Sequence, residues 1–418
     1  MILLSHPTGN ANVRHAALAL AEAGLLDTFW TGVSWPAESV LNRWIPGQIR
    51  RELARRSLPA LVQARTRHSP VREAGRMLAS KLGWNYPVRH ESGFFSIDAV
   101  NCALDRTVAH TVARRSGLSA VYAYEDCAAA TFQAAKRRGL GTIYDLPIGY
   151  WRAGHAIFEE EKTREPEWVS TMPGMLDSSE KLARKDAELH AADLVIVASS
   201  FTRKTLESAP GNGKPVAVIT YGSPESAEEP PFRTHGSKLR VLFAGALGQR
   251  KGLSYLLEAV ATMGAGVELT LLGRKSADDC APLNDAIKKH RWIPSLPHAE
   301  VLLEMGRHDV LVFPSLFEGF GLVILEAMSR GIPVITTSHT AGPDVIKDGQ
   351  DGFIVPIRSA EAIATRLEEL ARDSERLCAM KHAAYLAAGS FRWQAYRSQL
   401  VRTVRDTLAG SGWLPAGN

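Results

Sequence analysis

Apolar, strand-like runs alternate with helix-like segments along most of the chain, and this alternation limits the possible folds more than any other feature. The runs are rich in Val, Ile, Ala and Tyr. Strands that alternate with helices are typical of parallel sheets in α/β folds. We expect strands at 1–5, 120–124, 141–144, 194–198, 216–220, 239–244, 267–272, 310–313 and 333–336, with helices at 252–263, 322–329 and 391–408.

The alternation is interrupted once, by a polar and proline-rich stretch at residues 222–231, and then starts again. A chain of 418 residues is also too long for one compact core. We therefore predict two facing, doubly wound, Rossmann-like α/β domains with a cleft between them, since ligands bind beyond the carboxyl ends of parallel strands. The predicted parts are an N-terminal domain at 1–222, a linker at 223–237, a C-terminal domain at 238–388 and a helix at 389–418 that packs back toward the first domain.

Composition excludes several classes of protein. No run of about 18 apolar residues could cross a bilayer, and the first residues turn polar too early for a signal peptide. The four cysteines are far apart and have no metal-ligand spacing, so we expect reduced thiols. We accordingly expect a cytoplasmic protein.

Positive charge is concentrated between residues 41 and 90, where eleven Lys and Arg residues face only two acidic ones. Apolar residues, among them Trp44, Leu53 and Trp84, lie between these charges. Such a segment could attract anionic lipid headgroups at the inner face of a membrane or an acidic acceptor, or it could be an ordinary solvated helical surface. We expect no nucleic-acid binding, because no nucleic-acid-binding motif accompanies the charge.

The most informative segment runs from residue 314 to 328, directly after an expected strand, and carries two carboxylates around a Gly-x-Gly turn. Gly319 and Gly321 lack a Cβ, so the backbone there can bend sharply and approach a ligand. The helix expected from Leu322 has unpaired first N–H groups and a dipole that favour a phosphate. Glu318 could reach a group bound there, and Glu326 could accept hydrogen bonds from two vicinal hydroxyls. Two solvated acids at a helix end would show the same pattern.

A second glycine-flanked loop joins a strand to a helix at residues 244–252 and contains Arg250 and Lys251. Adjacent cations at such a loop suit a diphosphate, because Lys offers a point charge and Arg a planar fork. Two solvated basic residues remain the alternative.

Taken together, these segments resemble the retaining glycosyltransferases of family 4, which have the GT-B architecture. The resemblance rests on the Glu-x7-Glu segment and the residues up to Ile335, on Arg250-Lys251-Gly252, on His308-Asp309-Val310, and on residues 342–352. It covers nearly all of the predicted second domain.

The resemblance implies a role for each matching residue. Lys251 and Arg250 would hold the diphosphate of a nucleotide-sugar donor, Glu326 the ribose hydroxyls, and Glu318 the donor sugar near the reacting carbon. Backbone N–H groups around Phe320, Gly321 and Leu322 would orient sugar and phosphate, and Gly9 would let the first loop of the N-terminal domain approach the phosphates.

The sequence departs from the family pattern in two places. Relatives often carry an Arg about five residues before the diphosphate Lys, where this chain has Gly245-Ala246-Leu247. Many relatives also present a His from an N-terminal-domain strand end, where this chain has Asp145, with Glu125 on a neighbouring strand. Asp145 is our first candidate for the acceptor-side catalytic group and Glu125 the second, with a structural role as the alternative for each.

We therefore expect transfer of a sugar, with retention, from a nucleotide-diphosphate sugar to a hydroxyl on a glycan or a lipid-linked saccharide, in surface polysaccharide or glycoconjugate synthesis. Because the sequence has no Asp-x-Asp pair, we expect no metal or other cofactor. The alternatives are a catalytically silent nucleotide-sugar-binding protein and an epimerase or phosphorylase on the same architecture. A dinucleotide oxidoreductase is disfavoured, since no G-x-G-x-x-G follows the first strand.

Overall fold

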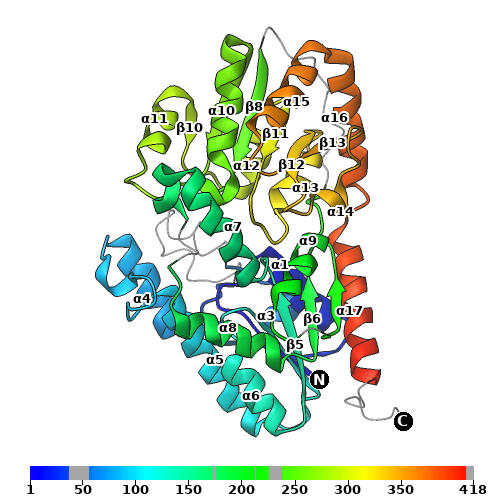
Figure 1. Ribbon diagram of the computed structural model, residues 1–418. Coiled ribbons are helices and arrows are strands. Elements are labelled where there is room, and N and C mark those ends of the chain that lie inside the picture. The colour runs from blue at the N-terminus through cyan, green and yellow to red at the C-terminus, as the bar shows by residue number, and fades with distance from the viewer. Residues whose placement is uncertain (37–55, 173–175, 212, 226–237, 411–418) are drawn as a thin grey trace.

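The computed structural model describes residues 1–36, 56–172, 176–211, 213–225 and 238–410, and these form two parallel sheets flanked by helices (Figure 1). The predicted α/β class with two doubly wound domains is confirmed. Part of the predicted basic segment, most of the predicted linker and the last eight residues lie outside the described residues. Within the described residues, no helix is both long and apolar enough to cross a membrane.

The first sheet has seven strands in the order β3-β2-β1-β4-β5-β6-β7, and all neighbours pair in parallel. The strands are β1 (Ile2–Ser5), β2 (Leu26–Thr31), β3 (Thr66–His68), β4 (Ala120–Tyr124), β5 (Gly141–Leu146), β6 (Leu194–Val197) and β7 (Val216–Val218). The central strands are buried along their whole length, as expected for a sheet covered on both faces.

The second sheet has six strands in the order β10-β9-β8-β11-β12-β13, again all parallel. They are β8 (Leu239–Ala244), β9 (Val267–Leu272), β10 (Arg291–Ile293), β11 (Val310–Phe313), β12 (Val334–Thr337) and β13 (Gly352–Val355). In both sheets the strand order reverses beside the first strand, which is where α/β sheets form ligand sites.

The helices that follow the strands cover both faces of each sheet. In the first half they are α1 (Ala11–Glu22), α3 (Ala60–Gln63), α4 (Pro70–Lys81), α5 (Ile97–Arg114), α6 (Ala129–Arg137), α7 (Trp151–Arg164), α8 (Ser179–Ala191) and α9 (Ser200–Thr205), with the 3-10 turns η2 (Tyr86–Val88) and η3 (Pro166–Thr171). In the second half they are α10 (Leu253–Met263), α11 (Ala281–Lys289), α12 (His298–Met305), α13 (Leu322–Met328), α14 (Gly342–Val345), α15 (Ala360–Arg372), α16 (Ser374–Ala388) and α17 (Trp393–Gly410), with η6 at Gln249–Lys251.

A single apolar cluster connects the two domains. It contains one face of the first sheet, including Leu4 and Tyr122, and one face of the second, including Leu242. Tyr221 and Phe320 lie between the sheets, with their ring centroids 5.0 Å apart. The two halves therefore share part of their hydrophobic core.

The segment formed by α7 and η3 belongs to the first half by sequence but packs on the second domain (Figure 1). Trp168 is buried in the apolar cluster around β8 and α10. The Cys280 thiol donates to the Glu167 carbonyl (3.4 Å), and Arg358 donates to the Ile157 carbonyl (2.8 Å). The spatial boundary between the domains therefore differs from a division of the chain at residue 222.

The last helix, α17, crosses back to the first domain and packs against α1 (Figure 1). The Trp393 ring stacks on His15 at 4.0 Å, and Arg397 pairs with Glu22 at 3.1 Å. The crossing lies beside the start of the linker, where the Ser223 N–H donates to the Phe391 carbonyl (2.6 Å). The expected direction of this helix agrees with these contacts.

Several local predictions require correction. The sequence did not reveal β2, β3, β10 and β13, because these strands are short or carry polar residues. The first helix, which has no counterpart among the expected helices, starts at Ala11, and the Asn12 amide donates to the Tyr221 hydroxyl (3.1 Å). Asp145, expected just beyond a strand, lies inside β5.

The close approach of the chain at residue 222 gives a test of the crossing. A Cβ on Gly222 would lie 2.4 Å from the Trp393 nitrogen, so Gly222→Ala must displace backbone. We expect a loss of about 1–3 kcal/mol in the free energy of unfolding, measured by urea titration. Gly266→Ala is the matched control, because no atom lies within 4 Å of its added Cβ. Equal losses in the two variants would contradict tight packing at this crossing.

Candidate functional site

The two predicted donor loops follow β8 and β11, which are neighbouring parallel strands at the reversal point of the second sheet. Because the carboxyl ends of both strands lie at the same edge, residues 245–252 and 314–321 meet there. The Leu316 N–H donates to the Arg250 carbonyl (2.9 Å), and the Ser315 hydroxyl donates to the same oxygen (3.1 Å). Strand order thus explains why two motifs far apart in sequence form one site.

Glu318 lies directly against both cations of the other loop. Its carboxylate forms an ion pair with Lys251 Nζ, and its Oε2 lies 3.3 Å from Nη1 of Arg250. Nη1 of Arg250 also donates to the Phe317 carbonyl (3.0 Å). Nζ of Lys251 lies 4.7 Å from the centroid of the Phe313 ring. Three of the predicted site residues are therefore brought together.

Burial makes this charge arrangement unusual. Lys251 is only 8% exposed, which argues against the alternative of a solvated basic residue at this position. Burial lowers the pKa of Lys251 well below its usual value, and the charge of Arg250 lowers it further. Burial likewise lowers the pKa of Arg250. Contact with the Glu318 carboxylate opposes these shifts, because a buried cation is tolerated only with a counter-charge.

Two glycines allow the loops to approach this closely. A Cβ on Gly252, which has φ +67°, would lie 2.1 Å from the Pro314 carbonyl oxygen. A Cβ on Gly321, which has φ +82°, would lie 2.8 Å from the Phe313 ring. Both positions need the left-handed backbone that glycine adopts without strain.

Glu326 lies on α13, directly after the second donor loop. It pairs with a residue that the sequence did not identify as part of the site. Its Oε1 lies 2.9 Å from Nε2 of His298, the first residue of α12. The hydrogen bond to Glu326 raises the pKa of His298. Among the described residues, Glu326 pairs with His298 and forms no ion pair with Lys251 or Arg250. A histidine after a proline at a helix start gave no recognisable sequence signal.

The remaining predicted donor residues line the same region without contacting the cations. Phe320 is buried against Tyr221, and its carbonyl accepts from the Ala341 N–H (2.9 Å). Leu322 begins α13, whose first turn has no side-chain cap. In the first domain, Gly9 has φ +61°, and its N–H donates to Nδ1 of His6 (3.1 Å).

The basic loop is held from the first half of the chain by a hydrogen-bond cluster that the sequence did not predict. Gln249, fully buried, donates through Nε2 to Oε1 of Glu161 (2.6 Å) and through its backbone N–H to the Thr171 hydroxyl (2.9 Å). Glu161 also accepts from the Tyr255 hydroxyl (2.8 Å) and from Nε of Arg358 (2.7 Å). The residue next to Arg250 is therefore fixed by the α7–η3 segment.

The two domains touch at Gly319. A Cβ on Gly319 would lie 1.8 Å from the Pro147 carbonyl oxygen, so no larger residue fits between the domains. The Thr202 hydroxyl donates to the Gly319 carbonyl (2.8 Å), and the Ser199 hydroxyl donates to the same atom (2.5 Å). At this point the predicted cleft is closed by direct contact between the domains.

The structure does not support Asp145 as the acceptor-side catalytic group, because its side chain does not reach a surface. The residue is 2% exposed, and Oδ2 accepts from the Tyr122 hydroxyl (2.6 Å). Burial raises its pKa to about 7, although hydrogen bonds from Tyr122 and Tyr124 oppose the shift. Buried tyrosines from both halves of the chain, including Tyr221 and Tyr396, lie near this carboxyl.

Glu125, the second candidate, lies at the end of β4 in a network of ion pairs. Its Oε1 lies 3.4 Å from Nζ of Lys185, which is also 3.7 Å from Asp177. Burial raises the pKa of Glu125 to about 7, and Lys185 opposes the shift. This network holds α8 against the end of β4, so a structural role accounts for Glu125.

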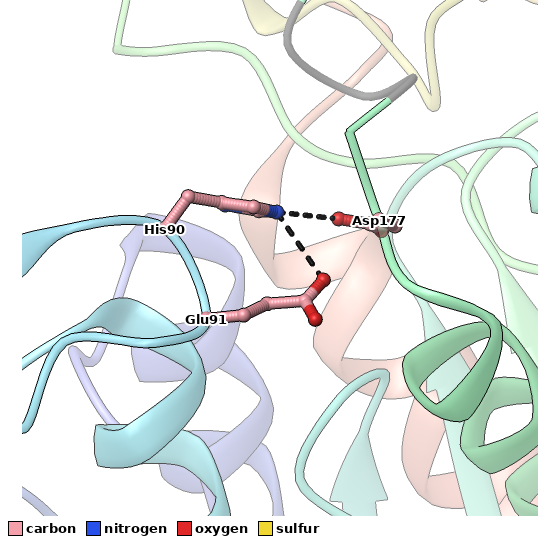
Figure 2. Close-up of side chains that lie close together, drawn as sticks. All are labelled: His90, Glu91 and Asp177. Carbon is pink, nitrogen blue, oxygen red and sulfur yellow. Dashed lines mark ion pairs between the residues drawn. The ribbon is translucent and has the colours of Figure 1, made fainter.

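One group in the described residues has the spacing of metal ligands. Nε2 of His90 lies 3.3 Å from Glu91 and 3.2 Å from Asp177, as Figure 2 shows. However, Asp177 already pairs with Lys181 (2.8 Å) and faces Lys185. Two ammonium groups beside the same carboxylate disfavour a metal cation, so we interpret this group as an ion-pair network.

Comparison with known proteins finds one family model that matches part of the chain. Residues 226–387 match the model described as glycosyl transferases group 1. These residues include both donor loops and α13.

The individual curated relatives are similar to only part of this chain. The chain is 25% identical over 210 residues to the capsular polysaccharide biosynthesis glycosyltransferase CapM of Staphylococcus aureus, which covers 46% of this chain and 55% of that protein. It is 32% identical over 183 residues to the phosphatidyl-myo-inositol mannosyltransferase of Mycobacterium leprae, which covers 41% and 47%, respectively. The chain thus spans about half the length of these curated relatives.

Solved structures extend the likeness to the whole fold. The sucrose-phosphate synthase of Thermosynechococcus elongatus superposes with a TM-score of 0.68 at 17% identity, covering 98% of this chain and 99% of that one. HepE of Anabaena, solved with UDP, superposes with a TM-score of 0.63 at 15% identity, covering 97% and 99%. The chain therefore has the GT-B fold.

The raised pKa of Asp145 predicts a pH dependence of stability. Between about pH 4 and pH 7 the unfolded chain releases this proton while the folded protein keeps it, so stability falls as pH rises. Asp145→Asn fixes the neutral form. The free energy of unfolding of the variant, measured by urea titration relative to the parent, should therefore rise by roughly 2–4 kcal/mol from pH 5 to pH 8.

Asp186→Asn provides the control for this measurement. Although burial opposes it, hydrogen bonds from Tyr150, Arg152 and Trp151 lower the pKa of Asp186, so this group is ionised in both states above pH 5. Its stability difference from the parent should not change between pH 5 and pH 8. A pH-independent difference for Asp145→Asn would show that this carboxyl is ionised in the fold.

Proposed function

We propose that the protein is a retaining glycosyltransferase that uses a nucleotide-diphosphate sugar. The observation that carries the proposal is the cluster of buried Lys251 with partly buried Arg250 and Glu318 at the strand-order reversal of the second sheet. It lies within the segment that matches glycosyl transferases group 1. Two adjacent cations at this position suit a diphosphate leaving group.

Donor binding would exchange one counter-charge for another. In the structure, Glu318 neutralises Lys251 and Arg250. A bound diphosphate would take over these two cations and release Glu318 toward the donor sugar, close to the reacting carbon. Glu326, oriented by His298, would accept hydrogen bonds from the ribose hydroxyls. Phe320, Gly321 and Leu322 would supply backbone N–H groups, and Gly9 the approach from the first domain.

Transfer requires movement between the domains. Gly319 is in contact with Pro147, Ser199 and Thr202, so a donor enters only when these contacts separate. Their return would exclude water and favour transfer over hydrolysis. Since Asp145 is buried, the diphosphate itself would help to deprotonate the acceptor.

The acceptor we propose is a glycan or a lipid-linked saccharide in surface polysaccharide or glycoconjugate synthesis, on the cytoplasmic side. Relatives named for capsular polysaccharide biosynthesis and for mannosyl transfer to a phosphatidyl-inositol support this choice. The nucleotide is supported by HepE, which was solved with UDP and with UDP-glucose.

A second candidate is a binding protein without turnover, which the burial of Asp145 favours. It would bind a nucleotide sugar and release no nucleoside diphosphate with any acceptor. An epimerised sugar nucleotide or phosphate-dependent cleavage would instead identify one of the other enzymes on this architecture.

Two substitutions test the donor site. Lys251→Ala should reduce turnover about 100- to 1000-fold, because it removes a charge that stabilises the leaving diphosphate. Glu326→Ala should weaken donor binding by about tenfold while leaving the KM for the acceptor unchanged, because it removes hydrogen bonds to a charged group. Donor affinity is measured by calorimetry and turnover by nucleoside diphosphate release.

Lys289→Ala and Glu300→Ala are matched controls, because these residues lie on α11 and α12 outside the donor loops. Since Lys251 is buried, thermal unfolding of each variant must be compared with the parent. Parent-like turnover in both Lys251→Ala and Glu326→Ala would show that the donor site is wrong.

The stereochemistry is tested on the product and the metal requirement on the turnover rate. We expect the product to keep the anomeric configuration of the donor, as measured by proton NMR during the first turnovers. We also expect turnover to be unchanged by excess EDTA, because fixed cations rather than a metal neutralise the diphosphate. An inverted product would exclude the retaining mechanism, and activity restored only by Mg²⁺ or Mn²⁺ would exclude metal independence.

A further inference from the structure

Helix α4 has its polarity reversed relative to an ordinary surface helix. Its buried side holds Glu73, which is fully buried and ion-paired with Arg56 and Arg76. Its outer side carries Val71, which is 73% exposed, and Leu78, which is 56% exposed. A helix that faces water normally shows the opposite pattern.

The exposed residues of this helix form one stripe. Val71, Ala74, Leu78 and Leu82 are all exposed, and their spacing of three and four residues places them on one helical face. Figure 1 shows α4 at the periphery of the first domain, next to α5. The stripe therefore faces away from both sheets.

Other apolar residues continue the exposed surface beyond the helix. Eight of the thirteen large hydrophobic side chains that are exposed in the described residues lie between positions 61 and 97. Beyond α4 they include Trp84, Tyr86, Phe94 and Ile97. We call the exposed residues from 71 to 97 the α4 surface. Apolar exposure concentrated in one segment marks an interaction site rather than the scattered exposure of ordinary surfaces.

The charges of this segment have one sign. Between residues 56 and 97 there are seven basic residues and two acidic ones. Glu73 is buried, and Glu91 is partly buried beside His90. The guanidinium of Arg72 lies 3.4 Å from the centre of the Phe94 ring, and that of Arg89 lies 5.8 Å from Tyr86. Two of the seven basic residues, Arg56 and Arg76, pair with the buried Glu73.

We propose that the α4 surface binds the surface of an anionic lipid bilayer. Its apolar stripe would enter the interface between headgroups and acyl chains, while the basic residues contact anionic headgroups. A second copy of the chain is a poorer occupant, because two identical basic surfaces repel each other. Charge complementarity therefore favours lipid over self-association.

The α4 surface is physically linked to the edge of the first sheet that faces the second domain. Glu91 accepts from the Ser178 N–H (2.9 Å), and His90 pairs with Asp177 at the start of the α8 region (Figure 2). Asp177 in turn faces Lys185, the partner of Glu125 at the end of β4. For a lipid-linked acceptor, which rests on the proposed function, this link would place the domain interface near the membrane.

Vesicle co-sedimentation of the full chain tests the proposal without donor or turnover, so its failure is distinguishable from failure of the proposed function. Vesicles of phosphatidylcholine with 30–40% phosphatidylglycerol are compared with pure phosphatidylcholine, at roughly 0.05 M and 0.5 M salt. We expect binding to the anionic vesicles that weakens at high salt. The double variant Leu78→Ser/Leu82→Ser should lower the partition constant about tenfold or more.

The matched control is Leu303→Ser/Leu386→Ser, which replaces two exposed leucines on α12 and α16, outside the α4 surface. This control should bind vesicles like the parent, and thermal unfolding should show that both double variants remain folded. Absence of parent binding to anionic vesicles, or equal losses in the two variants, would overturn the proposal. The proposal would also be overturned if the parent did not bind vesicles but formed a dimer in light scattering that Leu78→Ser/Leu82→Ser dissociates.

Discussion

The donor loops are organised by one electrostatic constraint, the placement of a buried and a partly buried cation side by side at the edge of the second sheet. Arg250 and Lys251 are held where water cannot solvate them well, and Glu318 supplies the counter-charge. Such a site favours any ligand that brings more negative charge than one carboxylate. The same burial that makes the cations difficult to accommodate also strengthens their interaction with a diphosphate.

The rigidity of this charged loop comes from residues of the other half of the chain. Glu161 and Thr171 fix Gln249, and these two residues belong to the α7–η3 segment that follows the last residues of β5. Pro147, which contacts Gly319 of the second domain, lies between β5 and α7 in this piece of chain. The position of the first sheet and the geometry of the basic loop are therefore mechanically coupled through one continuous piece of chain.

Local pattern was sufficient to predict the long buried strands and the two loops at the ends of β8 and β11, because parallel strands carry nearly continuous apolar runs. Local pattern did not predict the environment of residues whose contacts lie far away in the sequence. Asp145 is buried near Tyr221 and Tyr396, which lie far from it in the sequence. Glu161 and Gln249 are 88 residues apart, and the reversed polarity of α4 depends on the ion pairs of Glu73. No periodicity encodes such contacts.

Besides the α7–η3 segment, the described chain passes between the domains at Gly222–Ser223 and at Phe391–Trp393, and these two passages are hydrogen-bonded neighbours. A single flexible connection would let the domains tumble independently in three rotational directions. Two adjacent connections resist twisting and sideways displacement, which leaves bending about the line through both passages as the easiest motion. Opening and closing at Gly319 would then follow a nearly fixed path, and each return would bring the same atoms back into register.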